Sequence, residues 1–420
     1  MFKKIISLGL PLLCLLLFSP LANTAEACGG LFCQNDPVDQ AGERIVFTVN
    51  DDDTITSLIE IQYTGSAPDF SWILPIPGAI AAEDMAVPEE GESVFVELHR
   101  LTDVRIIAPP VPECAQVLFM AEAEMVEESA EEESGVEVFA SGEVGPFGFD
   151  VIGSSDPMAL ITWLRDNNYR VEPPMEPLIN VYVEEEFAFV AMRLLDGETS
   201  DSIKPIEITY PGRKPMIPLR LTAVAANNNM PIFTWVFADA QAVPENYEHM
   251  EIATEEITFS TFGSNNYVRL VQDRADALGG RAFITEFAAP ASSVELGNPY
   301  LQHLARQQSY LTRLTTYISP DEMTVDPIFG IEQRPDVSNI RDASNMVGLY
   351  DCERDQANNL INISGSDAID PETSSGEIAA ETPSQGRSGL GGWIAFGVTL
   401  LVLVGLIGWL LGRRSSQNFT

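Results

Sequence analysis

A run of 22 residues without a charged side chain, Leu390 to Leu411, lies near the C-terminal end of the 420-residue sequence. As a helix it would be roughly 33 Å long, which is enough to cross the hydrocarbon core of a bilayer. Tryptophans stand near its two ends, and Arg413 and Arg414 follow it directly. Because basic residues stay on the cytoplasmic side, the sequence predicts a transmembrane helix at 390–411 and a cytoplasmic tail at 412–420.

The first 27 residues have the parts of a secretory signal peptide. Lys3 and Lys4 are basic, residues 5–18 are mostly apolar, and Ala25-Glu26-Ala27 places small residues at a cleavage site. An uncleaved anchor fits less well, because the apolar run is short and contains Pro11. A signal peptide and one C-terminal span predict a single-pass type I protein of the cell membrane, with the bulk of the chain extracytoplasmic.

The C-terminal span has a second interpretation. Gly391-Gly392, the apolar run and the two arginines also resemble the bacterial sorting tags that a membrane protease removes. The sequence therefore leaves open whether the mature protein keeps this span.

The charge balance excludes one class of partner. The chain has 62 Asp and Glu residues against 23 Lys and Arg, a formal net charge of −39. Such a charge repels phosphate backbones, so we expect no nucleic-acid partner. The partners that remain are the membrane, through the C-terminal span, and an unknown envelope protein or surface ligand. No cofactor is evident, although the many carboxylates leave Ca²⁺ binding as an alternative.

Cysteine usage agrees with export. Cys14 lies in the signal peptide, and four cysteines remain: Cys28, Cys33, Cys114 and Cys352. An even number in an oxidising compartment predicts two disulfides with three possible connectivities, of which Cys28–Cys33 with Cys114–Cys352 is favoured. A metal site is the rival interpretation, but the paired spacing of zinc ligands is absent.

Period-two patterns predict several strands. Residues 45–49, an acidic turn at 50–53 and residues 55–63 read as a β-hairpin, and 72–78 as an extended edge segment that contains two prolines. The segment 59–65 is echoed by 206–212, which suggests two related β subdomains or a chance similarity of two amphipathic strands. Further strands are expected at 187–194, 216–224 and 232–238.

Capping signals predict short helices. Asp156-Pro157 and Asn298-Pro299 each combine an N-cap residue with proline at the first helical position. Helical spacing of apolar residues continues from 267 to 278, before Gly279-Gly280. A glutamate-rich stretch at 113–137 is expected to hold a helix and then an acidic loop.

Together these elements predict an α+β fold. It is expected to be mainly antiparallel β, with several short helices and the C-terminal transmembrane helix. The extracytoplasmic domain covers 28–352, with possible subdomains at 28–150 and 151–352. The segment 353–388 is rich in Ser, Gly and acidic residues, and it reads as a flexible acidic stalk.

Several short segments carry a family resemblance by their order along about 28–329. They are Cys28-Gly29-Gly30-Leu31-Phe32-Cys33 with 41–44, Phe70-Ser71-Trp72-Ile73-Leu74-Pro75-Ile76-Pro77, and segments 163–169, 280–287, 310–314 and 319–329. Together they resemble a bacterial secreted family catalogued as domain of unknown function 2330. The resemblance implies an exported envelope protein, often with a C-terminal anchor, and it implies no activity and no residue roles.

Motifs of common enzymes are missing from the sequence. It has no GxSxG nucleophile elbow, no HExxH zinc motif, no Walker loop and no Ser-x-x-Lys. The candidate site with most chemistry is an arginine and carboxylates expected near a helix end, namely Tyr310, Arg313, Asp321, Glu322 and Asp326. Such a set could perform acid–base work or hold a cation, or simply cap a helix with salt bridges.

The sequence therefore favours a non-enzymatic binding or structural ectodomain of the cell envelope. The alternatives are an envelope enzyme that uses the carboxylates near 310–326, and a divalent-cation-binding surface protein.

Overall fold

The computed structural model describes residues 31–32, 39–64, 71–111, 137–169, 171–198, 202–260, 263–346 and 348–350. Among these residues, no helix is both long and apolar enough to cross a bilayer. The predicted signal peptide, acidic stretch at 113–136, stalk, transmembrane helix and tail lie outside the described residues. So do all five cysteines, and with them both predicted disulfides.

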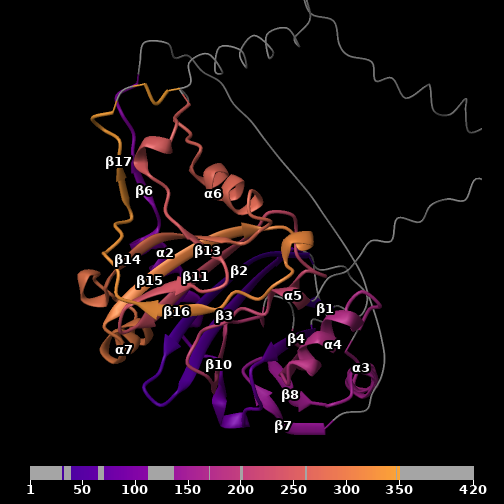
Figure 1. The fold of residues 1–420 in the computed structure, drawn as a ribbon. Coiled ribbons are helices and arrows are strands. Elements are labelled where there is room, and N and C mark those ends of the chain that lie inside the picture. Colours follow the sequence, from indigo (N-terminus) through magenta and orange to yellow (C-terminus); the bar gives the residue numbers. More distant parts are fainter. Residues whose placement is uncertain are drawn as a thin grey trace, which may run out of the picture. The chain divides into compact units, whose positions relative to one another are not determined.

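Two sheets dominate the described part of the chain (Figure 1). The larger has eight strands in the order β13 (Glu248–Met250), β14 (Ala282–Pro290), β15 (Tyr310–Ile318), β11 (Met230–Ala238), β2 (Asp39–Val49), β3 (Thr54–Thr64), β10 (Ile206–Pro211) and β5 (Met85–Ala86). The smaller has five, in the order β1 (Leu31–Phe32), β4 (Ser71–Ile76), β9 (Ala188–Leu194), β8 (Phe147–Gly153) and β7 (Glu137–Val144).

Short pairs complete the β structure. β12 (Gln241–Pro244) pairs with β16 (Phe329–Glu332), and β6 (Arg105–Ile107) pairs with β17 (Ile340–Asp342). Most strand pairs are antiparallel, while β11·β2, β13·β14 and β17·β6 are parallel. With six α-helices added, the described residues form a mixed α+β fold that is mostly sheet, as predicted.

The predicted hairpin is present as β2 and β3, which pair from Asp39 with Thr64 to Val49 with Ile55. The strand at 232–238 is also confirmed, because β11 covers it and runs parallel to β2. The two echoed segments lie on neighbouring strands, but β10 pairs with residues 54–59 of β3, so the segments meet only where Ile206 pairs with Ile59.

The two sheets pack face to face around the main core. Phe47 and Val236 of the larger sheet share one hydrophobic cluster with Phe149 and Val190 of the smaller sheet. Each of these residues is less than 5% exposed. In-facing and out-facing side chains alternate along each strand, so the opposite faces of both sheets need other cover.

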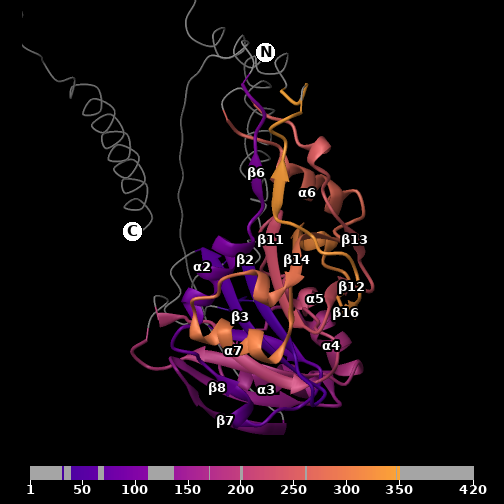
Figure 2. The same cartoon turned by 90° about the vertical axis from the view of Figure 1, so that its left-hand side faces the viewer.

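Helices cover those outer faces. α3 (Pro157–Asp166) and α4 (Glu176–Glu184) pack on the smaller sheet (Figure 1), where α3 and α4 residues cluster with Phe189 of β9. α2 (Gly91–Thr102) and α7 (Pro299–Gln307) pack on the larger sheet around Trp235 (Figure 2), and α6 (Tyr267–Asp276) packs against β14 and β15. The result is a helix–sheet–sheet–helix sandwich.

The predicted helices at 157–168, 267–278 and 299 onward are confirmed as α3, α6 and α7. The strand predicted at 216–224 is wrong, because Leu219–Thr222 forms the short helix α5. Pro215 and Pro218 remove two backbone donors from a strand there, so the chain turns after one bridge pair between Met216 and Ile328.

Asp156 at the start of α3 offers a direct test of the capping argument. Its carboxylate accepts hydrogen bonds from the backbone N–H groups of Met158 and Ala159 at 2.9 and 3.4 Å. We expect Asp156→Ala to lower the free energy of unfolding by about 1 kcal/mol, measured by chemical denaturation. Met158→Ala, which changes an exposed side chain in the same helix, is the control. Equal effects of the two changes would contradict the capping role.

Candidate functional site

The segment that carries the sequence-predicted site is a strand. Tyr310–Ile318 forms β15, which lies between β14 and β11, and only Pro320–Glu322 after it forms a single 3-10 turn. Four of the nine residues in β15 are β-branched and two are tyrosines, a composition that favours a strand. The prediction that these residues lie near a helix end is therefore wrong.

Three of the five candidate residues lie apart from any buried site. The Tyr310 hydroxyl donates a hydrogen bond to Asp336 at 2.7 Å on the surface. Asp321 is exposed, and Glu322 accepts from the backbone N–H of Ser319 at 2.9 Å, which closes its own turn. These contacts stabilise local structure and do not converge on a common point.

Arg313 is the fourth candidate, and it is only 3% exposed. Its Nε atom lies 2.8 Å from Oε2 of Glu286 on β14, although the N–H does not point at that oxygen, and its guanidinium also pairs with Asp103 after α2. The rings of Phe233 and Trp235 on β11 lie 5.3 Å from the guanidinium carbon. Arg313 is thus a buried cation between two carboxylates and two aromatic rings.

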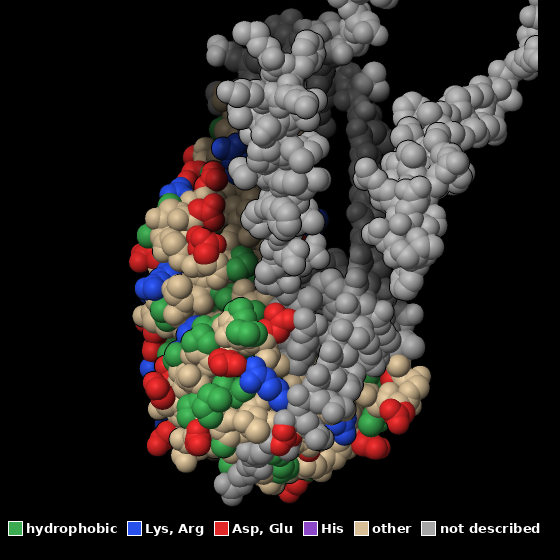
Figure 3. All heavy atoms as spheres, turned by 90° about the vertical axis from the view of Figure 1, so that its right-hand side faces the viewer, with side chains coloured by type: hydrophobic (Ala, Val, Ile, Leu, Met, Phe, Trp, Pro, Cys, Tyr) green, Lys and Arg blue, Asp and Glu red, His purple; other side chains and the backbone are tan. Residues whose placement is uncertain are grey.

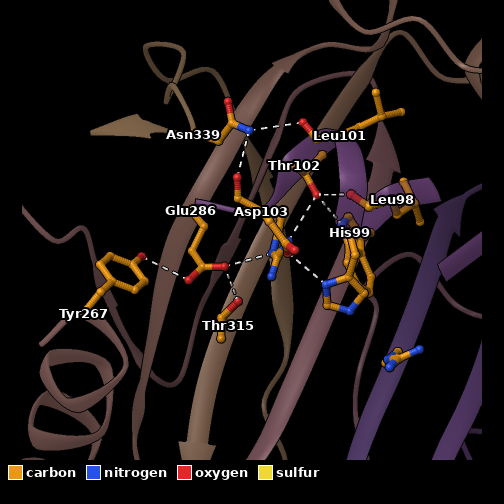
Figure 4. A network of polar contacts seen from close by, with 12 residues as sticks. Leu98, His99, Leu101, Thr102, Asp103, Tyr267, Glu286, Thr315 and Asn339 are labelled. Carbon is orange, nitrogen blue, oxygen red and sulfur yellow. Dashed lines mark hydrogen bonds and ion pairs between the residues drawn. The ribbon is translucent and has the colours of Figure 1, made fainter. Parts of the chain in front are cut away.

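Glu286 reaches this cluster because it is the extra residue of a β-bulge. The register of β14 against β15 shifts between Thr285 and Phe287, which turns the Glu286 side chain toward α6. Tyr267 at the start of α6 and Thr315 on β15 donate hydrogen bonds to its two oxygens at 3.0 and 2.7 Å (Figure 4). Burial and the adjacent carboxylate raise the pKa of Tyr267, so the phenol remains a donor.

The C-terminal end of α2 completes the cluster (Figure 4). Nδ1 of His99 lies 2.8 Å from Oδ1 of Asp103, and Trp235 donates its indole N–H to Thr102 at 2.9 Å. Burial opposes ionisation of Asp103, but hydrogen bonds from His99 and Arg313 hold its pKa below the usual range. The charge of Arg313 is compensated within the cluster, which ties α2 and α6 to the larger sheet.

Asp326, the fifth candidate, belongs to a separate polar cluster. It is 7% exposed and accepts a hydrogen bond from Tyr182 of α4 at 2.9 Å. Arg220 of α5 donates to it from both the backbone N–H and Nε, at 3.0 and 2.8 Å, and pairs with Glu185 as well. This cluster connects α4 to the chain after β15, so the structure does not bring Asp326 and Arg313 into one site.

Glu43 is a buried carboxyl group that the sequence argument missed. It is 4% exposed and accepts a hydrogen bond from the side-chain amide of Gln40 at 3.3 Å. It borders two small cavities between the sheets, each with room for about one water molecule. Burial raises the pKa of Glu43 to about 7. The spacing indicates this burial, because Glu43 lies two residues before Ile45 and therefore points to the same buried face of the strand as Ile45 and Phe47.

A larger cavity lies where the smaller sheet meets the end of α4. Its volume is about 550 Å³, within the range of ligand pockets. Apolar walls come from Ala79, Val183, Phe187, Ala188 and the ring of Phe139. Phe139 is the bulged residue of β7 and is 48% exposed. A Cβ atom at Gly153 would lie 2.5 Å from its ring, so the glycine lets the ring lie flat at the cavity wall.

Two carboxylates also line this cavity, Glu184 and Glu186. α4 ends in a Schellman motif, in which Phe187 N–H bonds to the Tyr182 carbonyl and Glu186 N–H to that of Val183. Glu186 occupies the left-handed position of this motif, with φ of 62°, where glycine is usual. Among the described residues, no lysine or arginine pairs with either carboxylate. This site could not be predicted from the sequence, because its parts come from four separate segments: 79, 139, 153–155 and 183–188.

The described part of the chain holds no group of three or more His, Cys, Asp or Glu side chains arranged to bind a metal ion. The acidic turn at 51–53 is exposed, and Asp53 pairs with Arg213. The structure therefore gives the calcium alternative no site within these residues.

One comparison with known proteins gives a match. The model of a family described as "uncharacterized protein conserved in bacteria", DUF2330, matches residues 22–330, about three-quarters of the chain. This range contains the cavity at Phe139, Glu43 and both buried ion-pair clusters. No curated protein and no solved structure matches the chain.

Proposed function

Because the chain belongs to the DUF2330 family of uncharacterized bacterial proteins, we propose its function from the geometry alone: it is a non-enzymatic binding ectodomain of the cell envelope. A signal peptide exports it, and one C-terminal span holds it in the membrane as a single-pass type I protein. The ligand site is the cavity at Phe139.

The single observation that carries this proposal is the composition of that cavity. It is an open hollow of about 550 Å³ whose lining combines apolar side chains with Ser154, Ser155 and two carboxylates, and among the described residues no basic side chain lines it. Apolar walls with a few charged groups are typical of ligand pockets, where burial supplies affinity and the charges fix orientation. The ligand that fits best has an apolar part and a cationic group.

An envelope enzyme has less support. Arg313 and Asp326, the two buried members of the sequence-predicted site, lie in different clusters and are hydrogen-bonded or ion-paired there. Neither residue lines the cavities at Glu43 or at Phe139. A catalytic group must reach a substrate, so internal compensation of both charges favours a structural role for them.

Binding of phenylethylamine tests the proposal, with phenylpropionate as the anionic analogue of similar shape. We expect the amine to bind the full chain, held in lipid nanodiscs, at least about tenfold more tightly than the acid, the equivalent of one favourable charge interaction. Calorimetry or ligand-observed NMR measures both. Glu186→Gln should remove most of the preference, and Phe139→Ala should weaken both ligands.

Glu186→Gly separates binding from folding. Glycine relieves the left-handed backbone at this position, so this variant should be as stable as the parent or more stable, yet lose the preference for the amine. Met158→Ala, an exposed apolar change on α3, is the control. Equal affinity for amine and acid, or binding that neither Phe139→Ala nor the Glu186 variants alter, would overturn the proposal.

A further inference from the structure

The strand beside the cavity has an open edge. β7 is the last strand of the smaller sheet, and seven of its eight residues pair with β8. Within the described residues, no strand pairs with its other side. A strand edge of this length presents a row of backbone N–H and C=O groups that can accept a further strand.

Apolar side chains mark the end of this edge nearest the cavity. Val138 and Phe139 are 41% and 48% exposed. The bulge in β7 places the Phe139 ring on the cavity wall, so the edge and the cavity form one continuous surface.

The charge of this surface selects the kind of partner. Glu143 on β7 is exposed, β7 contains no basic residue, and the cavity adds Glu184 and Glu186. Figure 3 shows hydrophobic and acidic side chains, with some basic ones among them, on the side of the molecule that carries α3 and α4. A second copy of the chain, with a net charge of −39, would set like charges against each other along the edge. A strand with basic and apolar residues would complement it.

We propose that β7 binds an extended segment of another protein, in which basic and apolar residues alternate, and that one of its side chains enters the cavity at Phe139. The segment adds a strand to the smaller sheet. Main-chain hydrogen bonds to β7 supply sequence-independent affinity, and the cavity with its carboxylates selects a side chain that is long and cationic, such as lysine or arginine. This inference rests on the proposed function, because it uses the same cavity.

The probe is a nine-residue peptide of alternating lysine and leucine, acetylated and amidated at its ends. We expect it to bind the full chain in nanodiscs at least about tenfold more tightly than phenylethylamine, because it adds backbone hydrogen bonds to the cavity contact. A peptide of the same sequence, N-methylated at every second residue, should lose about tenfold or more, since each methyl group removes one donor from the ladder. An alternating glutamate and leucine peptide should not bind measurably.

Two matched variants locate the contact. Glu143→Lys reverses a charge on β7 and should weaken the affinity for the lysine–leucine peptide by about fivefold or more. Glu255→Lys makes the same change at an exposed position in a 3-10 turn outside β7 and the cavity, and it should have little effect on that affinity.

If phenylethylamine binds but N-methylation leaves peptide affinity unchanged, edge pairing is wrong and the cavity proposal survives. If neither probe binds, both proposals fail. Concentration-dependent dimerisation of the chain through β7, blocked by Glu143→Lys, would assign the edge to a second copy and overturn the inference.

Discussion

Replacing Arg313 with methionine is expected to lower the free energy of unfolding by about 3–5 kcal/mol, the usual effect of removing one partner of a buried ion pair. Arg313 is 3% exposed, and its loss leaves Glu286, which is 4% exposed, as a buried carboxylate without a cation. The ring contacts with Phe233 and Trp235 are lost as well. Denaturation followed by tryptophan fluorescence measures the effect, because Trp235 lies in the cluster.

A double-mutant cycle separates pairing from packing. Glu286→Gln alone should also destabilise, but the double variant Arg313→Met/Glu286→Gln should lose less than the sum of the two, with a coupling energy of about 1–3 kcal/mol. Arg269→Met is the matched control, because Arg269 and Asp273 form an exposed pair at 3.4 Å whose worth is below about 1 kcal/mol. An effect at Arg313 no larger than at Arg269 would refute a structural role for the cluster.

The elements that the sequence predicts best are those that depend on neighbouring residues. Asp156-Pro157 and Asn298-Pro299 each hold their own helix start, through hydrogen bonds to backbone N–H groups two and three residues ahead. The hairpin of β2 and β3 follows from alternation and a short acidic turn. Such signals do not need the rest of the fold, so the sequence alone reveals them.

The buried clusters depend on contacts between distant residues, which a single sequence does not reveal. Glu286 faces its partners because it is the extra residue of a bulge in β14. The alternation of polar and apolar residues around it does not predict this bulge. Tyr182 meets Asp326 across 144 positions of the chain. The sequence grouped Arg313 and Asp326 in one candidate site because they are close along the chain, whereas the fold places them in different clusters.

The cavity at Phe139 illustrates the same limit. Its walls come from β7, from the end of β8 and from the end of α4, and α4 itself was not predicted. One residue of this cavity departs from a local rule. Glu186 follows the end of α4 at the left-handed position where glycine or asparagine is usual. A residue that departs from the local rule is a candidate for function, because backbone strain is retained only where something offsets it.

Stability is expected to fall as the pH rises from about 5 to 8, and Glu43 is expected to cause most of that fall. In the folded protein, burial raises the pKa of Glu43 to about 7, against an ordinary value of 4.5. Between these values the folded state holds a proton that the unfolded state releases. The stabilising contribution is therefore complete below pH 4.5 and is lost as the pH rises through 7.

The size of this effect follows from the gap between the two pKa values. Each unit of the gap corresponds to about 1.4 kcal/mol, so ionisation of Glu43 should cost about 3 kcal/mol above pH 8. Among the described residues, Glu43 and Tyr210 are the titratable side chains that line the two adjoining cavities. Burial raises the pKa of Tyr210 far above this range, so Tyr210 does not titrate with Glu43. Water in those cavities can solvate the carboxylate only in part.

Glu43→Gln isolates this contribution, because glutamine has nearly the same shape and no charge. We expect the variant to match the parent at pH 5 and to exceed its free energy of unfolding by about 3 kcal/mol at pH 8, measured by urea denaturation across that range. Glu89→Gln, which changes an exposed carboxylate, should keep the pH dependence of the parent. Parallel pH profiles for the parent and Glu43→Gln would mean that Glu43 is already ionised in the fold, and its carboxylate would then need a cation or water contacts beyond Gln40.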